Sequence, residues 1–117
     1  MNKPNVIKEK SFKFALKVIT LSQLLVSKNE FVISRQLLKS GTSIGANVEE
    51  AGAAQSKRDF IAKMAIASKE ERETKYWLRL LKHGEFLIFD AEQHLKEINE
   101  IINILTSIVK TSQQNLK

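Results

Sequence analysis

Residues 40–51 read SGTSIGANVEEA and contain two glycines, three hydroxyl-bearing residues and an asparagine. This composition is typical of a loop, and a break at Gly41 would leave two short pieces instead of one helix. On a helical wheel, at about 100° per residue, the apolar residues and the glycines of this region gather on neighbouring sides. The apolar face consists of Leu37, Ile44, Val48 and Ala51, with Gly41, Gly45 and Gly52 along its edge. We therefore interpret residues 34–54 as one helix.

The glycine edge (Gly41, Gly45 and Gly52) calls for a structural reason, because each glycine destabilises a helix by about 1 kcal/mol relative to alanine. We expect a neighbouring helix to approach closely there. Ser34 is the expected N-cap of this helix. On its other flank, polar residues recur at spacings of three, four and three. This polar ridge consists of Ser40, Ser43, Asn47 and Glu50.

Three further helices are expected over about residues 8–26, 57–83 and 91–112. The third helix in the chain has a capping pattern at Ser56 and Asp59 and ends before Gly84, and the fourth follows a similar pattern at Asp90. The first has two adjacent apolar rows, a width that predicts neighbours on two sides. These are the Phe12 row (Phe12, Leu16, Ile19 and Val26) and the Phe14 row (Phe14, Val18, Leu21 and Leu25). The fourth carries a narrow predicted seam of Ala91, Leu95, Ile98, Ile102, Leu105 and Val109.

Length and composition agree with this pattern. The chain has 117 residues, with one proline and four glycines, and Leu, Ile, Ala, Lys and Glu are abundant. Four helices joined by short connections predict a single all-α domain over residues 1–117, an antiparallel up-down-up-down four-helix bundle. Cysteine is absent, and neither a signal-like hydrophobic core nor an apolar run long enough for a membrane span occurs. We expect a cytoplasmic protein without a membrane partner.

The net charge of +6 is unevenly placed. Residues 1–39 hold eight Lys and Arg against two Glu, whereas residues 40–117 hold eleven basic and eleven acidic residues. A basic segment can bind phosphate, although surface lysines also serve solubility alone. The candidate nucleic-acid-binding residues are the α-helical row Lys10, Lys13 and Lys17, together with Arg35 and Lys39.

Carboxylates fall on the apolar side of residues 57–83: Glu70 and Glu71 lie inside the arc, and Glu73 lies beside Trp77. Buried carboxylates need partners, for which we expect the polar ridge, Arg35 or another subunit. A di-metal site in such a bundle would use Glu-x-x-His pairs. Leu80 and Ala91 stand three residues before His83 and His94, so no metal or cofactor is expected. We expect Trp77 in the core or an interface; stacking of Tyr76 and Trp77 on a base is the alternative.

Two stretches carry a resemblance to a known family. QLLKSGTSIGANVEEA (residues 36–51) and DFIAKMAIASKEERETKYWLRLL (residues 59–81) resemble the four-helix-bundle family of bacterial 23S rRNA-intervening-sequence proteins. The family name records where some of the genes lie, within ribosomal RNA genes, and not a biochemical activity. The resemblance implies one signature in each of two helices. Their members are Ser40, Gly41, Ser43, Ile44, Gly45, Asn47 and Glu50, then Glu70, Glu73, Thr74, Trp77 and Leu78.

The resemblance also implies assembly, because relatives form ring-like homopentamers. A distant branch, the accessory proteins of diversity-generating retroelements, works with a reverse transcriptase and binds nucleic acid through a basic surface. No residue of this chain marks membership of that branch. We therefore expect a non-enzymatic homopentamer that binds RNA or another nucleic acid. An oligomeric scaffold for a protein partner, with no nucleic-acid role, is the alternative.

Overall fold

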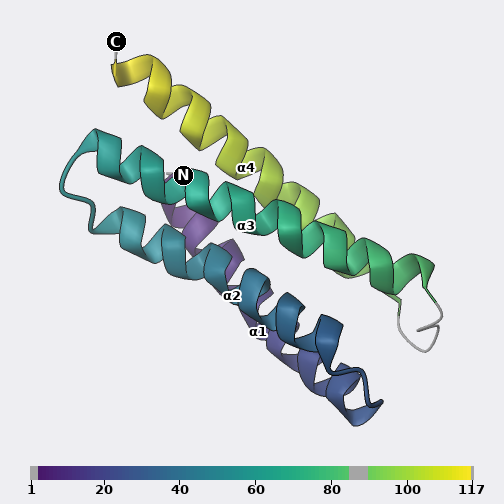
Figure 1. The fold of residues 1–117 in the computed structure, drawn as a ribbon. Helices are drawn as coiled ribbons and strands as arrows, with labels where there is room; N and C mark the ends of the chain where they lie inside the picture. Colours follow the sequence, from purple (N-terminus) through teal and green to yellow (C-terminus); the bar gives the residue numbers. More distant parts are fainter. Residues whose placement is uncertain (1–2, 85–89, 117) are drawn as a thin grey trace.

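The computed structural model describes residues 3–84 and 90–116, which form four helices and no strand (Figure 1). The helices are α1 (Lys3–Ser27), α2 (Val32–Gly52), α3 (Lys57–His83) and α4 (Glu92–Leu116). Helix α1 begins five residues before the range expected from the sequence, and α4 ends four residues beyond it. The predicted all-α class is confirmed.

Consecutive helices run in opposite directions (Figure 1). Between α1 and α2, the Ser22 hydroxyl donates to the Ser34 carbonyl at 3.1 Å, and Lys8 pairs with Glu49 at 3.6 Å. The later α1 residue thus meets the earlier α2 residue, which fixes an antiparallel pair. In the contacts of α2 with α3 and of α1 with α4, described below, later residues of one helix again meet earlier residues of the other. These two pairs are therefore antiparallel as well. The predicted up-down-up-down bundle is confirmed.

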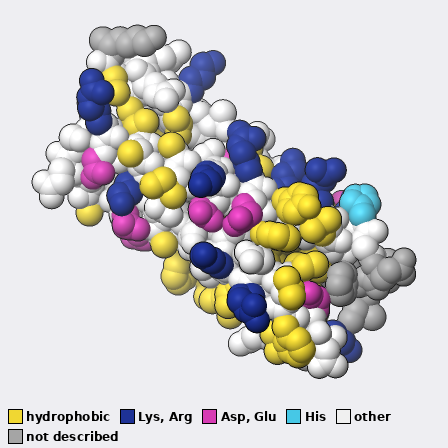
Figure 2. Space-filling model, viewed as in Figure 1, with side chains coloured by type: hydrophobic (Ala, Val, Ile, Leu, Met, Phe, Trp, Pro, Cys, Tyr) yellow, Lys and Arg dark blue, Asp and Glu magenta, His cyan; other side chains and the backbone are white. Residues whose placement is uncertain are grey.

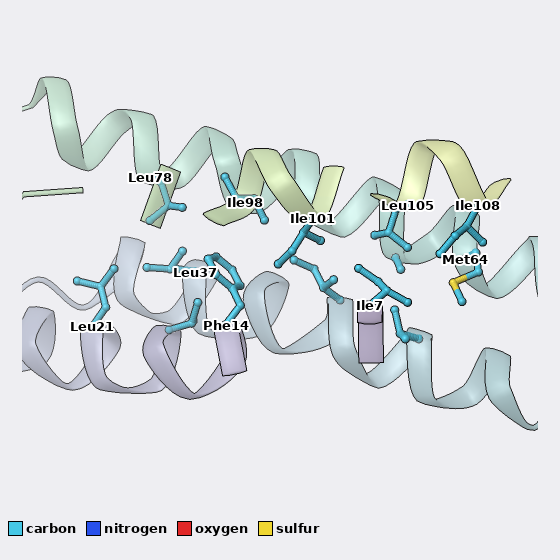
Figure 3. Packing of buried hydrophobic residues seen from close by; sticks show 14 of the residues in the cluster. Ile7, Phe14, Leu21, Leu37, Met64, Leu78, Ile98, Ile101, Leu105 and Ile108 are labelled. Atoms are coloured by element: carbon cyan, nitrogen blue, oxygen red, sulfur yellow. The ribbon is translucent and has the colours of Figure 1, made fainter. Parts of the chain in front are cut away.

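One apolar core lies between the four helices (Figure 3). In the close view, Phe14, Leu21 and Leu37 of the α1–α2 layer point toward Leu78 and Ile98 of the α3–α4 layer. These five side chains are almost completely buried. Burial of a side chain of this size contributes about 1.5–3 kcal/mol, so the core holds the outward-facing residues on a firm scaffold.

Only one of the two apolar rows of α1 enters this core. The Phe14 row is buried, whereas Phe12 is 61% exposed and Leu16 is 51% exposed, and the rest of the Phe12 row is exposed as well. Helix α1 has neighbours on two sides, α2 and α4, as the width of its apolar face predicts, but only the Phe14 row packs against them. Helix α1 packs closely on α2 and less extensively on α4, which leaves the Phe12 row uncovered.

Residues 40–51, whose composition is typical of a loop, are helical throughout, so the helix interpretation is confirmed. A Cβ atom on Gly41 would lie 2.8 Å from both γ carbons of Val18, which is closer than real Cβ atoms approach. A Cβ on Gly45 would lie 3.4 Å from the Ser11 carbonyl oxygen, and one on Gly52 would meet only a lysine side chain, with its nitrogen at 3.6 Å. The neighbouring helix at the glycine edge is α1, and the tightest approach is at Gly41.

The α1–α2 connection differs from its prediction. Asn29 adopts a left-handed conformation, with φ of 64°, and ends α1 in the way a glycine often does. Helix α2 begins at Val32, and the Glu30 carboxylate accepts from the Ile33 N–H at 3.0 Å. Ser34 as N-cap is therefore wrong: it is buried inside the first turn of the helix. A glutamate two residues before the helix provides the acceptor instead.

The caps of α3 and α4 follow the sequence more closely. Ser56 is extended, and its hydroxyl accepts from the Asp59 N–H at 3.1 Å, as the capping pattern predicts. Helix α3 ends before Gly84, but Gly84 has an extended conformation instead of a left-handed one. At the start of α4, the Asp90 carboxylate accepts from the Glu92 N–H at 3.0 Å.

The residues of α4 that are buried lie on a slightly different side of the helix from the predicted seam. Ile101 and Ile108 are buried where Ile102 and Val109 were expected, and those two residues are only partly buried. Leu95 is also partly buried. The buried line is Ala91, Ile98, Ile101, Leu105 and Ile108.

Candidate nucleic-acid interface

The α1 lysines predicted to contact phosphate lie where α1 meets α4, and each forms an ion pair. Two of their partners are glutamates of α4, and the third belongs to α1 itself. The pairs are Lys10–Glu100, Lys13–Glu9 and Lys17–Glu97, with nitrogen–oxygen distances of 3.1, 2.8 and 2.5 Å. Three cations are thus balanced by three carboxylates, which reduces the positive potential that the sequence alone indicated.

The pair between Lys17 and Glu97 is supported by its surroundings. Partial burial alone would raise the pKa of Glu97, but hydrogen bonds from Lys17 and Gln93 lower it overall. Glu97 therefore remains ionised at neutral pH. Exposed ion pairs contribute only about 0–1 kcal/mol, so a phosphate can still compete for these lysines. Their binding role stays a prediction.

The two α2 candidates, Arg35 and Lys39, are exposed and lie one turn apart on the outer face of the helix. Neither forms an ion pair with a carboxylate in residues 3–84 or 90–116. Two cations one turn apart form a small patch, so their role in binding phosphate also stays a prediction.

A different group of cations surrounds a groove between the C-terminal half of α3 and the start of α4. The groove has a volume of about 590 Å³. Four cationic side chains line it against one carboxylate, giving a net charge of +3 with neutral histidine. The polar neighbours Gln93 and Asn99 add hydrogen-bonding groups. The charged lining residues are Lys75, Arg79, Lys82, Lys96 and Glu92, and His83 lies beside them.

Most of this charge is available to a ligand. Lys82 pairs with Glu92. Lys75, Arg79 and Lys96 form no ion pair with any carboxylate that the structure describes. Figure 2 shows Lys and Arg side chains gathered over the C-terminal half of α3, next to a histidine and a hydrophobic patch. Among the described residues, the α3–α4 groove therefore offers more unpaired positive charge than the lysine row of α1 does.

Sequence reasoning missed the groove because it averaged charge over long segments. The balanced count for residues 40–117 hides a stretch of α3, residues 74–83, that contains cations and no carboxylate. Arg72, Lys75, Arg79 and Lys82 recur at spacings of three, four and three, which places them along one side of a helix. From that spacing, the row of cations on α3 could have been predicted from the sequence.

The polar ridge of α2 faces α3. Its buried member, Ser40, has its hydroxyl 2.9 Å from that of Thr74, which in turn lies 2.8 Å from the Glu70 carbonyl oxygen. Because a carbonyl only accepts, Thr74 donates to Glu70 and Ser40 donates to Thr74. At the other end of the ridge, Glu50 pairs with Lys63 at 3.2 Å. Ser40 and Thr74 therefore join α2 and α3 inside the bundle.

The middle of the ridge bonds within α2. The Ser43 hydroxyl donates to the Lys39 carbonyl at 2.6 Å, and the Asn47 amide donates to the Ser43 carbonyl at 2.8 Å. Both side chains are half-buried at the α2–α3 face. They do not contact the α3 carboxylates through any hydrogen bond in the described residues, so the expected pairing is not found there.

Of the three glutamates on α3, Glu71 is the buried one, with 0% exposure. One of its oxygens accepts from the Ser68 hydroxyl at 3.1 Å, and the other has no hydrogen-bond partner among the described residues. Burial raises the pKa of Glu71 to about 7, against the opposing effect of the Ser68 hydrogen bond. Glu70 is half-buried and Glu73 is exposed. Neither the polar ridge nor Arg35 pairs with Glu71.

Trp77 packs against the hydrophobic core and is half-buried, which fits the expected core position. Its ring lies edge-on to that of Tyr76, with centroids 5.2 Å apart and planes at 67°. Tyr76 is 52% exposed. The neighbouring aromatic residues therefore differ: Trp77 anchors α3, and Tyr76 presents its ring to solvent.

The histidines do not come together. His83 is exposed at the end of α3, while His94 is half-buried on α4, and burial lowers its pKa. Within the described residues, no three His, Asp or Glu side chains form a group that would hold a metal ion. In the same part of the chain, no helix has the length and apolar content that a membrane span requires.

Comparisons with known proteins place the chain in a family. No curated protein matches it. A crystal structure of a protein of unknown function from the S23 ribosomal protein family of Bacteroides thetaiotaomicron superposes with a TM-score of 0.89 at 48% sequence identity. The match covers 93% of this chain and 99% of that one. The model of the 23S rRNA-intervening sequence protein family matches residues 3–107, and the chain belongs to this family.

Proposed function

We propose that this protein is a non-enzymatic, homo-oligomeric protein of the bacterial cytoplasm that binds RNA or another nucleic acid through a basic surface. The observation that carries the proposal is the α3–α4 groove, with its net charge of +3 and three cations free of described carboxylates. Lysine and arginine side chains in a concave surface bind phosphate without reading sequence. The relevant ligand is therefore a phosphate backbone.

Self-association supports this function in two ways. The exposed Phe12 row gives α1 an apolar face, which is a frequent feature of subunit contacts. Repetition of the groove in each subunit would combine weak phosphate contacts by avidity. Ring-like pentamers among family relatives make five subunits the proposed number.

The first test is the mass of the untagged protein by size exclusion with light scattering, with absorbance recorded at two wavelengths. A mass of five times 13.3 kDa with excess absorbance of nucleic acid is the expected result. A pentamer free of nucleic acid that also fails to bind added RNA would overturn the binding part of the proposal. A monomer would overturn the oligomeric part.

Replacing Lys75 and Arg79 together with glutamine is expected to weaken RNA binding and flatten its salt dependence. For single strands, the slope of log K against log salt becomes shallower by about 0.7 for each phosphate that the protein no longer neutralises. Fluorescence anisotropy at several salt concentrations measures both effects. Unchanged affinity and slope would show that the groove does not bind phosphate.

The same titration tests the prediction for α1. Lys10→Gln with Lys13→Gln removes the same charge from a surface whose lysines are already paired. We expect affinity to fall less than it does for the groove variant. A greater fall in affinity would instead place the main phosphate-binding surface on α1, together with Lys17, Arg35 and Lys39.

The exposed Phe12 row favours a second candidate function, an oligomeric scaffold for a protein partner. Phe12→Ser with Leu16→Ser is expected to reduce the measured mass, because both side chains are more than half exposed in the single chain. Leu116→Ser, at the exposed end of α4, is the control and should leave the mass unchanged. If these substitutions leave the mass unchanged and the wild-type protein does not bind RNA, the Phe12 row is better explained as a surface that binds a different protein.

A further inference from the structure

The exposed ring of Tyr76 directly follows Lys75, a lining residue of the α3–α4 groove, but is not itself one of the residues that line it. Arg72, Tyr76, Arg79 and His83 are spaced by four, three and four residues, so they follow one side of the helix. Arg79 and His83 also line the α3–α4 groove. An aromatic ring is therefore bordered along the helix by an arginine on each side.

The Tyr76 ring packs against the ring of its neighbour Trp77. Trp77 is held by the hydrophobic core, and the Tyr76 ring rests edge-on against it. The Tyr76 side chain nevertheless remains 52% exposed. Such a ring has less rotational freedom to lose on binding than one standing alone on a surface, and its outer side is open to a flat partner.

We propose that the α3–α4 groove binds single-stranded nucleic acid, with Tyr76 stacking on an unpaired base while Lys75, Arg79 and Lys96 contact the adjacent phosphates. This inference rests on the proposed function and specifies its ligand class. Bases of a single strand are free to stack on aromatic side chains, and cationic grooves follow its backbone. In a duplex the bases are stacked on each other, so Tyr76 would have no base face to meet. The combination of ring and groove favours the single strand.

The test compares an RNA of about 20 nucleotides, longer than a typical single-strand site, with the same RNA annealed to its complement. Wild type is expected to bind the single strand more tightly. Tyr76→Leu keeps an apolar side chain of good helix propensity but removes the aromatic face, and Tyr76→Phe keeps that face. We expect Tyr76→Leu to weaken single-strand binding about 5- to 150-fold, the range that corresponds to removing one stacked base. Tyr76→Phe should bind as wild type does.

A second readout comes from Trp77, the chain's single tryptophan, which lies against Tyr76. Its fluorescence is expected to change on addition of the single strand and to change less on addition of the duplex. Circular dichroism melts of both Tyr76 variants check that the bundle is intact.

The outcomes separate this inference from the proposed function. If wild type binds single strand and duplex equally and Tyr76→Leu binds both as wild type does, the single-strand inference fails while nucleic-acid binding stands. If wild type binds neither RNA, both fail. If polyglutamate displaces the RNA as well as an unlabelled single strand does, the groove is a general anion site and the inference fails.

Discussion

Gly41→Leu is expected to lower the free energy of unfolding by about 2–3 kcal/mol, within the usual range for overpacking a core. The reason is geometric, because even a Cβ at this position would lie 2.8 Å from both γ carbons of Val18. Val18 is fully buried, and a β-branched side chain in a helix has one strongly preferred rotamer. Thermal and urea unfolding followed by circular dichroism measure the destabilisation, which corresponds to a melting temperature lower by about 10 °C.

A graded series of glycine variants tests the same idea along α2. Gly45→Leu is expected to cost less than Gly41→Leu, since its Cβ would lie 3.4 Å from the Ser11 carbonyl oxygen of α1, a longer distance than the 2.8 Å at Gly41. Gly52→Leu at the exposed helix end should stay within about 0.5 kcal/mol of wild type. A melting temperature of Gly41→Leu equal to or above that of wild type would contradict the close approach of α1.

A double-mutant cycle identifies the contact itself. Gly41→Ala is expected to be destabilising in wild type but much less so when Val18→Ala has removed the two γ carbons. The interaction energy of the two changes should therefore be favourable and of the order of 1 kcal/mol, as is common for residues in contact. Additive effects would show that Val18 is not the limiting neighbour.

The sequence predicted the architecture well because its strongest signals are local. The alignment of Gly41 and Gly45 indicates a helix with a close neighbour, and the capping residues Ser56 and Asp90 mark helix starts that the structure contains. Each of these signals depends on residues within one or two turns. No knowledge of the partner helix is needed to interpret them.

The rotations of the helices were harder to predict. In α4, Ile101 lies beside Ile102 and Ile108 beside Val109, so two apolar lines fit the wheel almost equally well. In α1, the Phe12 row and the Phe14 row are similarly apolar. Which line is buried depends on where the other helices lie, and that is a property of the whole bundle.

The candidate site was the least predictable part, for two physical reasons. Ion pairs such as Lys10–Glu100 join residues 90 positions apart, so the sequence alone could not show that the α1 cations are neutralised. The groove draws its charge from the end of α3 and from Lys96 of α4, across a connection in the chain. The row of cations on α3 could be predicted from its spacing in the sequence, but the concave shape of the groove could not.

The second large effect is expected at Glu71, whose carboxyl is completely buried with one oxygen lacking a described partner. Burial raises its pKa from 4.5 to about 7 in the folded protein. The folded state therefore holds this proton more strongly than the unfolded chain does. Stability from this group is fully present below about pH 4.5 and is lost as the pH rises toward 7, because ionisation then favours unfolding.

Glu71→Gln removes the ionisation while keeping the size and shape of the side chain and an acceptor for Ser68. We expect it to raise the free energy of unfolding by about 1–3 kcal/mol near pH 8, since each unit of pKa shift corresponds to about 1.4 kcal/mol. Near pH 4 the variant and wild type should be almost equally stable. Urea unfolding across this pH range measures the difference.

Glu73→Gln is the matched control, because Glu73 lies half a turn away on the same helix and is exposed. Its stability should follow that of wild type across the whole range. If Glu71→Gln is less stable than wild type at high pH, the ionised carboxylate must have a partner that the amide cannot replace. Since Glu71 lies on the α3 face that carries Thr74 and its bond to Ser40, such a partner would have to come from within the bundle and not from solvent.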